Sequence, residues 1–199
     1  MPTAMESTID AQETALREAL AGIVARRQEA LARFYDETVS RVYGLALRIT
    51  ARSDAAEEIA ADVYMQVWNQ AGRFDQGRGC VLAWLLTICR SRAIDYLRRA
   101  DQAESWAAPP EAEGSAADDP QDLLMALESG RAVAVALEAL PPLQRQMLAL
   151  AFFRGLTHED IARHFPLPLG TVKTHIRKAL AGLRKSLSSR MRAGALRRS

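Results

Sequence analysis

Hydrophobic residues recur at helical spacing along most of this chain, and its longest periodic segment contains no proline. From Thr8 to Ile49 good helix formers dominate, and the apolar positions near the end follow the three- and four-residue spacing of an amphipathic helix. The first twenty or so residues lack strong caps, which leaves open a frayed lead-in helix or disorder there. The pattern predicts an all-α fold.

A second helix is predicted from Ser53 to about Gln70, with Ser53 or Asp54 and then Glu57 matching a capping pattern. Its apolar face is expected to be buried, and consists of Ala56, Ile59, Ala60, Val63 and Val67. Its outward face carries Asp54, Glu57, Glu58 and Met65, with Asp62 at the border. Acids mixed with a large apolar side chain favour a protein-binding surface, although a solvated acidic face is the alternative.

A glycine-rich loop from Gly72 to Gly79 precedes the segment VLAWLLTICRSRAIDYLRRA, which predicts a third helix. Its first half is expected to bury Leu82, Leu85, Leu86 and Cys89. Basic and aromatic residues are interleaved over the loop and the helix: Phe74, Arg78, Trp84, Arg90, Arg92, Tyr96, Arg98 and Arg99. Cations suit phosphates and flat rings suit unstacked bases, so this stretch favours contact with single-stranded or melting DNA. The pattern leaves open whether Trp84 packs in the core or contacts DNA.

The composition changes abruptly from Asp101 to Asp122, where alanine, proline and acidic residues dominate. Too few apolar residues remain there to offset the entropy of ordering, so we expect a flexible acidic linker between two small helical domains. Beyond it, two further helices are separated by Pro141 and Pro142 and marked by Val133, Leu137, Leu140, Leu143, Met147 and Leu150.

The segment from Gly155 to Lys178 reads as two short helices joined by a tight turn. Thr157 and Asp160 match a capping box at the first start, and two prolines separate the helices. The buried face of the second helix is expected to contain Val172, Ile176, Leu180, Leu183 and Leu187. Its other face and edges carry Thr171, Lys173, Thr174, His175, Arg177 and Lys178. A helix-turn-helix presents such side chains to the major groove of duplex DNA.

Charge is distributed unevenly, although the net charge is only +2. No acidic residue occurs from Thr171 to the C-terminus, whereas Asp101 to Glu128 contains no lysine or arginine. An unmixed cationic end favours DNA binding over the alternative, an ordinary amphipathic helix pair whose cationic face is only solvated.

Other classes of protein receive little support. The apolar runs are short, and the N-terminus lacks the pattern of a signal peptide, so neither export nor membrane insertion is expected. Cys80 and Cys89 show neither CxxC spacing nor a nearby histidine pair, which predicts reduced cytoplasmic thiols and no metal site; a redox-sensing pair is the alternative. HExxH, GxSxG and glycine-rich phosphate motifs are missing, so we expect neither an enzyme nor a cofactor.

Three segments, in this order, resemble the bacterial sigma-70 family: DAAEEIAADVYMQVW, WLLTICRSRAIDYLRR and ALPPLQRQMLALAFFRGLTHEDIARHFPLPLGTVKTHIRKAL. Within the family the chain looks like an extracytoplasmic-function (group 4) sigma factor, which keeps only region 2 and region 4. The resemblance covers about Leu20 to Leu187. It implies an N-terminal extension at 1–19, region 2 at 20–100, an acidic linker at 101–125, region 4 at 126–188 and a basic tail at 189–199.

The resemblance also implies a function, which is to bind core RNA polymerase and direct it to specific promoters. The helix with Glu57, Glu58, Asp62 and Met65 would dock onto the coiled coil of the β′ clamp, and region 4 would meet the β flap. The loop with Phe74 and the helix from Trp84 to Arg99 would recognise and open the −10 element. Ser91 in that helix stands where the family commonly has asparagine, so the −10 preference is expected to differ.

By the same resemblance, the helix from Thr171 to Lys178 would read the −35 element, and an anti-sigma factor is expected as a further partner. The acidic linker would thread a polymerase channel that later carries RNA, either as a mimic of that anion or as a plain tether. The rival interpretation is a helix-turn-helix regulator that acts without polymerase. It leaves two features without a role: the arginine-rich aromatic helix, and the acidic helix face that carries Met65.

Overall fold

The structure is a computed structural model that describes residues 4–104 and 131–196, and within these ranges it contains helices and turns but no strand. The chain divides into two compact units, Met1–Pro109 and Pro110–Ser199. An all-α fold in two helical units was predicted and is confirmed.

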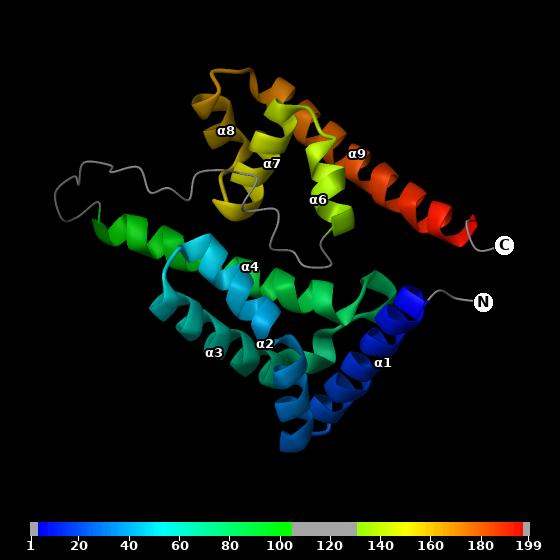
Figure 1. The fold of residues 1–199 in the computed structure, drawn as a ribbon. Helices are drawn as coiled ribbons and strands as arrows, with labels where there is room; N and C mark the ends of the chain where they lie inside the picture. The colour runs from blue at the N-terminus through cyan, green and yellow to red at the C-terminus, as the bar shows by residue number, and fades with distance from the viewer. Residues whose placement is uncertain (1–3, 105–130, 197–199) are drawn as a thin grey trace. The chain divides into compact units, whose positions relative to one another are not determined.

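The first unit contains four helices: α1 (Ala4–Val24), α2 (Gln28–Thr50), α3 (Ser53–Gln70) and α4 (Val81–Glu104). Between α3 and α4 the chain forms two short 3-10 turns, η1 (Ala71–Arg73) and η2 (Gln76–Arg78). Helices α2, α3 and α4 pack side by side, and α1 folds back along α2 (Figure 1). The core between them contains fully buried side chains from every helix, among them Leu16, Phe34, Val63 and Leu85.

The helical pattern that the sequence shows from Thr8 to Ile49 is interrupted once, because the chain reverses direction between α1 and α2. Arg26 adopts a left-handed conformation with φ of 58°. Its guanidinium group donates to the Trp68 carbonyl oxygen at 3.0 Å and lies 5.3 Å from the centre of the Trp68 ring. Gly22 permits the tight reversal, since a Cβ atom there would lie 2.5 Å from that of Ala30.

Helix α1 is part of the first unit and not a separate extension. Leu16, Leu20 and Ile23 are at most 4% exposed, and α1 packs against α2 and α4. The unit therefore begins before residue 20, the boundary expected from the sequence. At its other end α4 continues to Glu104, into the segment expected to be linker; the rest of the linker lies outside the described residues.

Helix α3 has the predicted bounds and buried face, but its start is stabilised differently. Its N-cap residue is Arg52, which makes no side-chain cap, so the capping pattern expected from Ser53 or Asp54 with Glu57 is wrong. The Arg52 guanidinium instead binds the Asp54 carboxylate through two contacts of 3.1 and 2.5 Å. That bond and the Ala55 backbone N–H lower the pKa of Asp54 to about 2.

The second unit contains α6 (Arg131–Glu138), α7 (Pro142–Phe153), α8 (His158–His164) and α9 (Leu169–Leu196). Pro142 occupies the first turn of α7, where its missing N–H costs no hydrogen bond. Helices α6, α7 and α8 each pack against α9 (Figure 1). Their shared core is built around Met147, Ile161, Val172 and Ile176.

The buried face of α9 differs from the predicted one at Leu180, which is 52% exposed. Ala179 is fully buried instead, and Leu183 is half-buried. Positions 172, 176, 179 and 183, which are buried or half-buried, follow a three- and four-residue alternation, whereas a strict four-residue step to 180 leaves the stripe that faces the core. The side chain of Leu187 lies outside the described residues.

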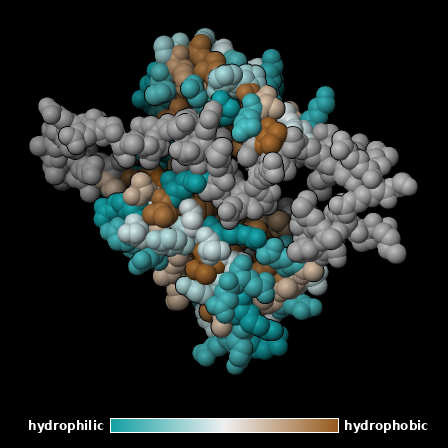
Figure 2. Space-filling view, viewed as in Figure 1, coloured by the Kyte–Doolittle hydropathy of each residue, from teal (hydrophilic) through white to brown (hydrophobic). Residues whose placement is uncertain are grey.

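Figure 2 shows one face of the molecule, where hydrophobic residues occur in small separate groups among hydrophilic ones. Within the described part of the chain, no helix has the length and apolar character needed to cross a membrane.

Two leucine-sized residues on α9 provide a test of this packing. Ile176→Ala should lower the free energy of unfolding of the second unit by about 2–5 kcal/mol, because it leaves a cavity in a packed core. Leu180→Ala should lower it by less than about 1 kcal/mol, because half of that side chain is already in water. Urea unfolding of the full-length chain followed by circular dichroism measures both, and equal losses would contradict the observed register of α9.

Candidate nucleic-acid and protein interfaces

The acidic face of α3 is accessible, as predicted. Glu57, Glu58 and Asp62 are exposed, and Met65 is 61% exposed, a high value for a large apolar side chain. Met65 also lines a groove of about 590 Å³ between α2 and α3. The groove is lined mainly by apolar and aromatic side chains: Leu31, Ala32 and Tyr35 from α2, and Tyr64, Met65 and Trp68 from α3.

Sequence reasoning missed the part of this surface that α2 supplies. Tyr35 is 44% exposed and packs against Tyr64, with ring centres 4.7 Å apart. Asp36 adds an acid at the groove. Tyr35, an aromatic residue on the polar side of its helix, could have indicated this surface in the sequence. The groove itself could not be predicted, because it exists only where α3 packs beside α2.

One predicted docking residue and one predicted DNA-binding residue bind each other. Arg92 on α4 lies 3.4 Å from an Asp62 carboxylate oxygen and donates from Nε to the Gln66 side-chain oxygen at 3.0 Å. Both side chains of the ion pair are about half exposed, so the pair itself adds little stability. Arg92 nevertheless joins α4 to α3, a contact between residues thirty positions apart that the sequence does not reveal.

The loop between α3 and α4 brings two of the predicted aromatic residues together. The Phe74 and Trp84 rings lie 5.6 Å apart at an angle of 58°, and both are half-buried. They line an open cavity of about 390 Å³ together with Arg73, Asp75, Gly79, Cys80, Ala83 and Thr87. Trp84 thus packs against Phe74 and still lines an accessible cavity, so core packing and ligand contact are compatible at this position.

The arginines of α4 differ in their surroundings. Arg98 and Arg99 are exposed, and Arg99 donates to the Asp95 carbonyl oxygen at 3.3 Å. Arg90 is half-buried, and burial together with the charge of Arg98 lowers its pKa, although an arginine remains charged at neutral pH. Ser91 is exposed and donates to the Thr87 carbonyl oxygen, and Tyr96 is half-buried. The side chain of Arg78 lies outside the described residues.

The two cysteines are free thiols in different environments. Cys80 is exposed at the cavity beside Trp84. Cys89 is fully buried, donates to the Val42 carbonyl oxygen at 3.3 Å, and has its pKa raised to about 12 by burial. A buried thiol with so high a pKa is unreactive, which argues against a redox-sensing pair.

The helix-turn-helix forms as predicted, from α8, the turn at residues 165–168 and the start of α9. The capping box is confirmed: the Thr157 hydroxyl accepts from the Asp160 N–H at 3.1 Å, and Asp160 accepts from the Thr157 N–H at 2.9 Å. Arg163 pairs with the same Asp160 carboxylate. Helix α9 begins at Leu169, directly after the turn.

The predicted reading residues lie in the first turns of α9. Lys173, Arg177 and Lys178 are exposed, whereas Thr171, Thr174 and His175 are half-buried. The Thr174 hydroxyl donates to the Gly170 carbonyl oxygen at 2.8 Å, which leaves its oxygen available as an acceptor. The Nδ1 atom of His175 is buried and, within the described residues, has no hydrogen-bond partner. Among those residues no cluster of three or more His, Cys, Asp or Glu side chains forms a metal site.

The comparisons with known proteins identify the family. The family model "Sigma-70 region 2" matches residues 34–103, and "Sigma-70, region 4" matches residues 136–185. Each match lies in one of the two helical units, and the chain belongs to the sigma-70 family as an ECF RNA polymerase sigma factor. Sigma factors bind core RNA polymerase and promoter DNA to initiate transcription and are not enzymes. The match to region 2 disfavours a regulator that acts without polymerase.

Within this group the chain is similar to the ECF RNA polymerase sigma factor SigK. It is 38% identical to SigK of Mycobacterium tuberculosis over 168 residues, which is 83% of this chain and 89% of the relative. SigK of Mycolicibacterium vanbaalenii is also 38% identical, over 181 residues and 87% and 90% of the two chains. Among solved structures, Rhodobacter sphaeroides SigE in complex with the anti-sigma ChrR is 32% identical, covers 87% of this chain and 98% of its own, and has a TM-score of 0.45.

Proposed function

We propose that this sigma factor divides promoter-directed initiation among three surfaces. The acidic face of α3 with its neighbouring groove docks onto the β′ clamp of core polymerase, the loop and α4 recognise and melt the −10 element, and the first turns of α9 read the −35 element while region 4 meets the β flap. The observation that carries the proposal is the juxtaposition, within one small unit, of an acidic apolar face on α3 and an arginine-rich aromatic face on α4. The protein works in the cytoplasm, where core polymerase is found.

The docking role is supported by the chemistry of the α3 surface. An exposed methionine and three aromatic residues line the groove, and flexible Met and rigid aromatic side chains are typical anchors for a partner helix. Glu57, Glu58 and Asp62 are exposed on the same helix as Met65, and their negative charge would steer a basic partner and set its orientation.

Reversing the acidic charge tests the docking role. Glu58→Lys with Asp62→Lys should weaken binding of core polymerase by about tenfold or more, since like charges would then face the basic partner. A fluorescence titration of the full-length protein with core polymerase measures this affinity. Glu18→Lys with Glu37→Lys, two exposed acids on α1 and α2, is the control with the same change in net charge. Equal effects of the two pairs would refute the docking assignment.

The melting role is supported by the geometry of the loop and α4. Opening a duplex costs stacking and pairing energy, which the protein can offset only by holding the exposed strand. Phe74 and Trp84 offer ring surface at an open cavity, and Arg90, Arg98 and Arg99 offer charge along the following turns of α4. Arg92 contributes less directly, because it binds Asp62 and Gln66 on α3.

Phe74→Ala with Arg90→Ala should separate promoter binding from promoter melting. We expect the variant holoenzyme to form a closed complex at the promoter and fail to open it, because the ring and the cation that hold the strand are gone. Permanganate reactivity of unpaired thymines near the start site measures opening, and Arg33→Ala on α2 is the control arginine. Normal reactivity in the double variant would refute the role, and loss of polymerase binding would mean that these residues are structural.

The −35 role is supported by three exposed cations in the first turns of α9, next to the Thr174 and His175 side chains. Hydroxyl, imidazole and guanidinium groups can bond to base edges in the major groove, while lysines bind phosphates.

Single alanine substitutions at Lys173, Thr174, Arg177 and Lys178 should fall into two classes. A base-reading member should cost about 1–3 kcal/mol and relax the preference at one base pair. A phosphate-binding member should weaken all sequences alike and reduce the salt dependence of binding. Holoenzyme titrations with −35 duplexes at several salt concentrations sort the variants, and Lys185→Ala, further along α9, should leave base preference unchanged. If all four variants bind as wild type does, α9 is not the reader.

We further propose that an anti-sigma factor holds the protein inactive until a signal releases it, an arrangement common in this family. The acidic segment between the units would thread a polymerase channel that later carries RNA, either as a mimic of that anion or as a plain tether between region 2 and region 4.

A further inference from the structure

The N-terminal helix α1 precedes the segment that the region 2 family model matches, which begins at residue 34, yet it touches the loop between α3 and α4. The helix and the loop enclose a groove of about 330 Å³, lined by Arg17, Leu20, Ala21 and Val24 from α1 and by Ala71, Gly72, Phe74 and Gln76 from the loop. Phe74 lines both this groove and the cavity beside Trp84. Helix α1 therefore lies next to Phe74, the aromatic ring proposed above to contact the −10 strand.

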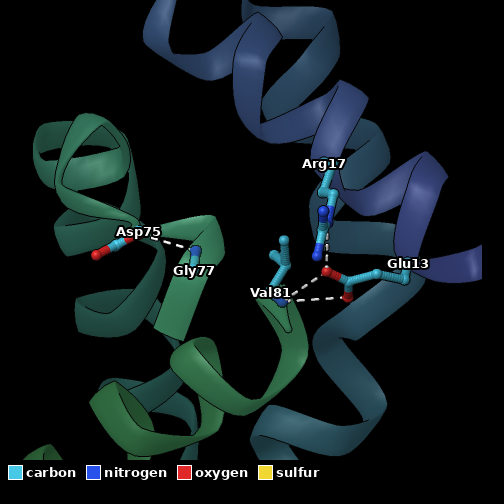
Figure 3. Close-up of polar contacts among 5 residues, drawn as sticks. All are labelled: Glu13, Arg17, Asp75, Gly77 and Val81. Carbon is cyan, nitrogen blue, oxygen red and sulfur yellow. Dashed lines mark hydrogen bonds and ion pairs between the residues drawn. The ribbon is translucent and has the colours of Figure 1, made fainter. Parts of the chain in front are cut away.

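A carboxylate of α1 binds the first residue of α4 (Figure 3). Both oxygens of Glu13 accept from the backbone N–H of Val81, each at 3.1 Å. This N–H is one of the four at a helix start that have no acceptor within the helix, and the N-terminal end of a helix favours negative charge. Glu13 thus supplies the N-terminal cap of α4 from another helix.

A neighbouring cation fixes the orientation of that carboxylate. Arg17, one helical turn after Glu13, donates from Nε to a Glu13 oxygen at 2.7 Å (Figure 3). The Glu13 side chain is only 20% exposed, so these charge-assisted bonds are largely protected from water. The same oxygen accepts from both Arg17 and Val81, which makes the three groups one connected contact.

The loop that ends at Val81 is shaped by two local features. The Asp75 side chain accepts from the Gly77 N–H at 2.9 Å (Figure 3), and Gly79 has φ of 149°, a conformation that favours glycine. These two features shape only the residues next to them. The bond from Glu13 to Val81 spans 68 residues and joins the end of the loop to α1.

We propose that Glu13, oriented by Arg17, is a positioning residue for the −10 site. By capping α4 it fixes the end of the loop and hence the placement of the Phe74 and Trp84 rings, so α1 takes part in promoter recognition. This inference rests on the role proposed above for the loop. Without the cap, fewer molecules hold the loop in its binding-competent shape, and the apparent affinity for the DNA strand falls by the same fraction.

The test uses the full-length protein with core polymerase and a fluorescent single strand carrying the non-template −10 sequence. Glu13→Ala should weaken strand binding by about fivefold, the size expected for loss of a helix cap. Glu13→Gln keeps an acceptor and should recover part of the affinity. Core affinity should stay unchanged in both variants, and Glu18→Ala, which removes an exposed acid of the same helix, should behave as wild type.

Amide hydrogen exchange in the same proteins measures directly whether the Val81 N–H is protected by the cap. The peptide that includes Val81 should exchange faster in Glu13→Ala than in wild type or in Glu18→Ala. Unchanged exchange there, or strand binding within twofold of wild type, would overturn the proposal. So would an equal loss of strand and core binding, because Glu13 would then support the whole unit and not the loop.

Phe74→Ala separates this inference from the proposed function. If Phe74→Ala weakens strand binding and Glu13→Ala does not, only the positioning role fails. If Phe74→Ala binds the strand as wild type does, the loop is not the −10 site and both proposals fall.

Discussion

The packing of one face of α2 against both α3 and α4 is the constraint on which the first unit depends. Phe34, Val42 and Val63 have no exposed surface, and a buried polar pair, Thr38 with Tyr64, joins α2 to α3 inside this core. The Thr38 hydroxyl and the Tyr64 hydroxyl lie 2.8 Å apart, and Thr38 also donates to the Phe34 carbonyl oxygen. A shift of one helix along the other would leave the buried Tyr64 hydroxyl without this partner, so the pair favours one register among those with similar apolar contact. That register sets where the acidic and basic faces lie.

Each surface of the first unit uses the side of a helix that the core does not need. Helix α3 presents Glu58 and Met65 outward, and α4 presents Arg98 and Arg99. The two helices also bind each other through Arg92 and Asp62, an exposed pair that contributes little to stability. A contact this weak can be exchanged for one with a partner at small cost, while the apolar core keeps both helices in place.

The features that the sequence predicted are those determined within a few residues. The capping box of Thr157 and Asp160 spans three positions, and the buried face of α3 follows from helical periodicity alone. The features it missed depend on distant residues. The reversal at Arg26 is held by Trp68, the tie of Arg92 to α3 needs Gln66, and the groove beside Met65 needs Tyr35. Leu180 was misplaced because hydrophobicity suggests burial, whereas the buried stripe of α9 contains Ala179 and leaves Leu180 half exposed.

The bond between residues 13 and 81 also bears on how the protein is made. A ribosome adds on the order of 5–20 residues per second, so α1 emerges several seconds before the residue that it caps. During that interval α1 can pair with α2, its neighbour in sequence, and cover Leu16 and Ile23. The loop gains its tie to α1 only once Val81 has been synthesised. Helices α1, α2 and α3 are therefore synthesised in full before the bond that ties the end of the loop to α1 can form.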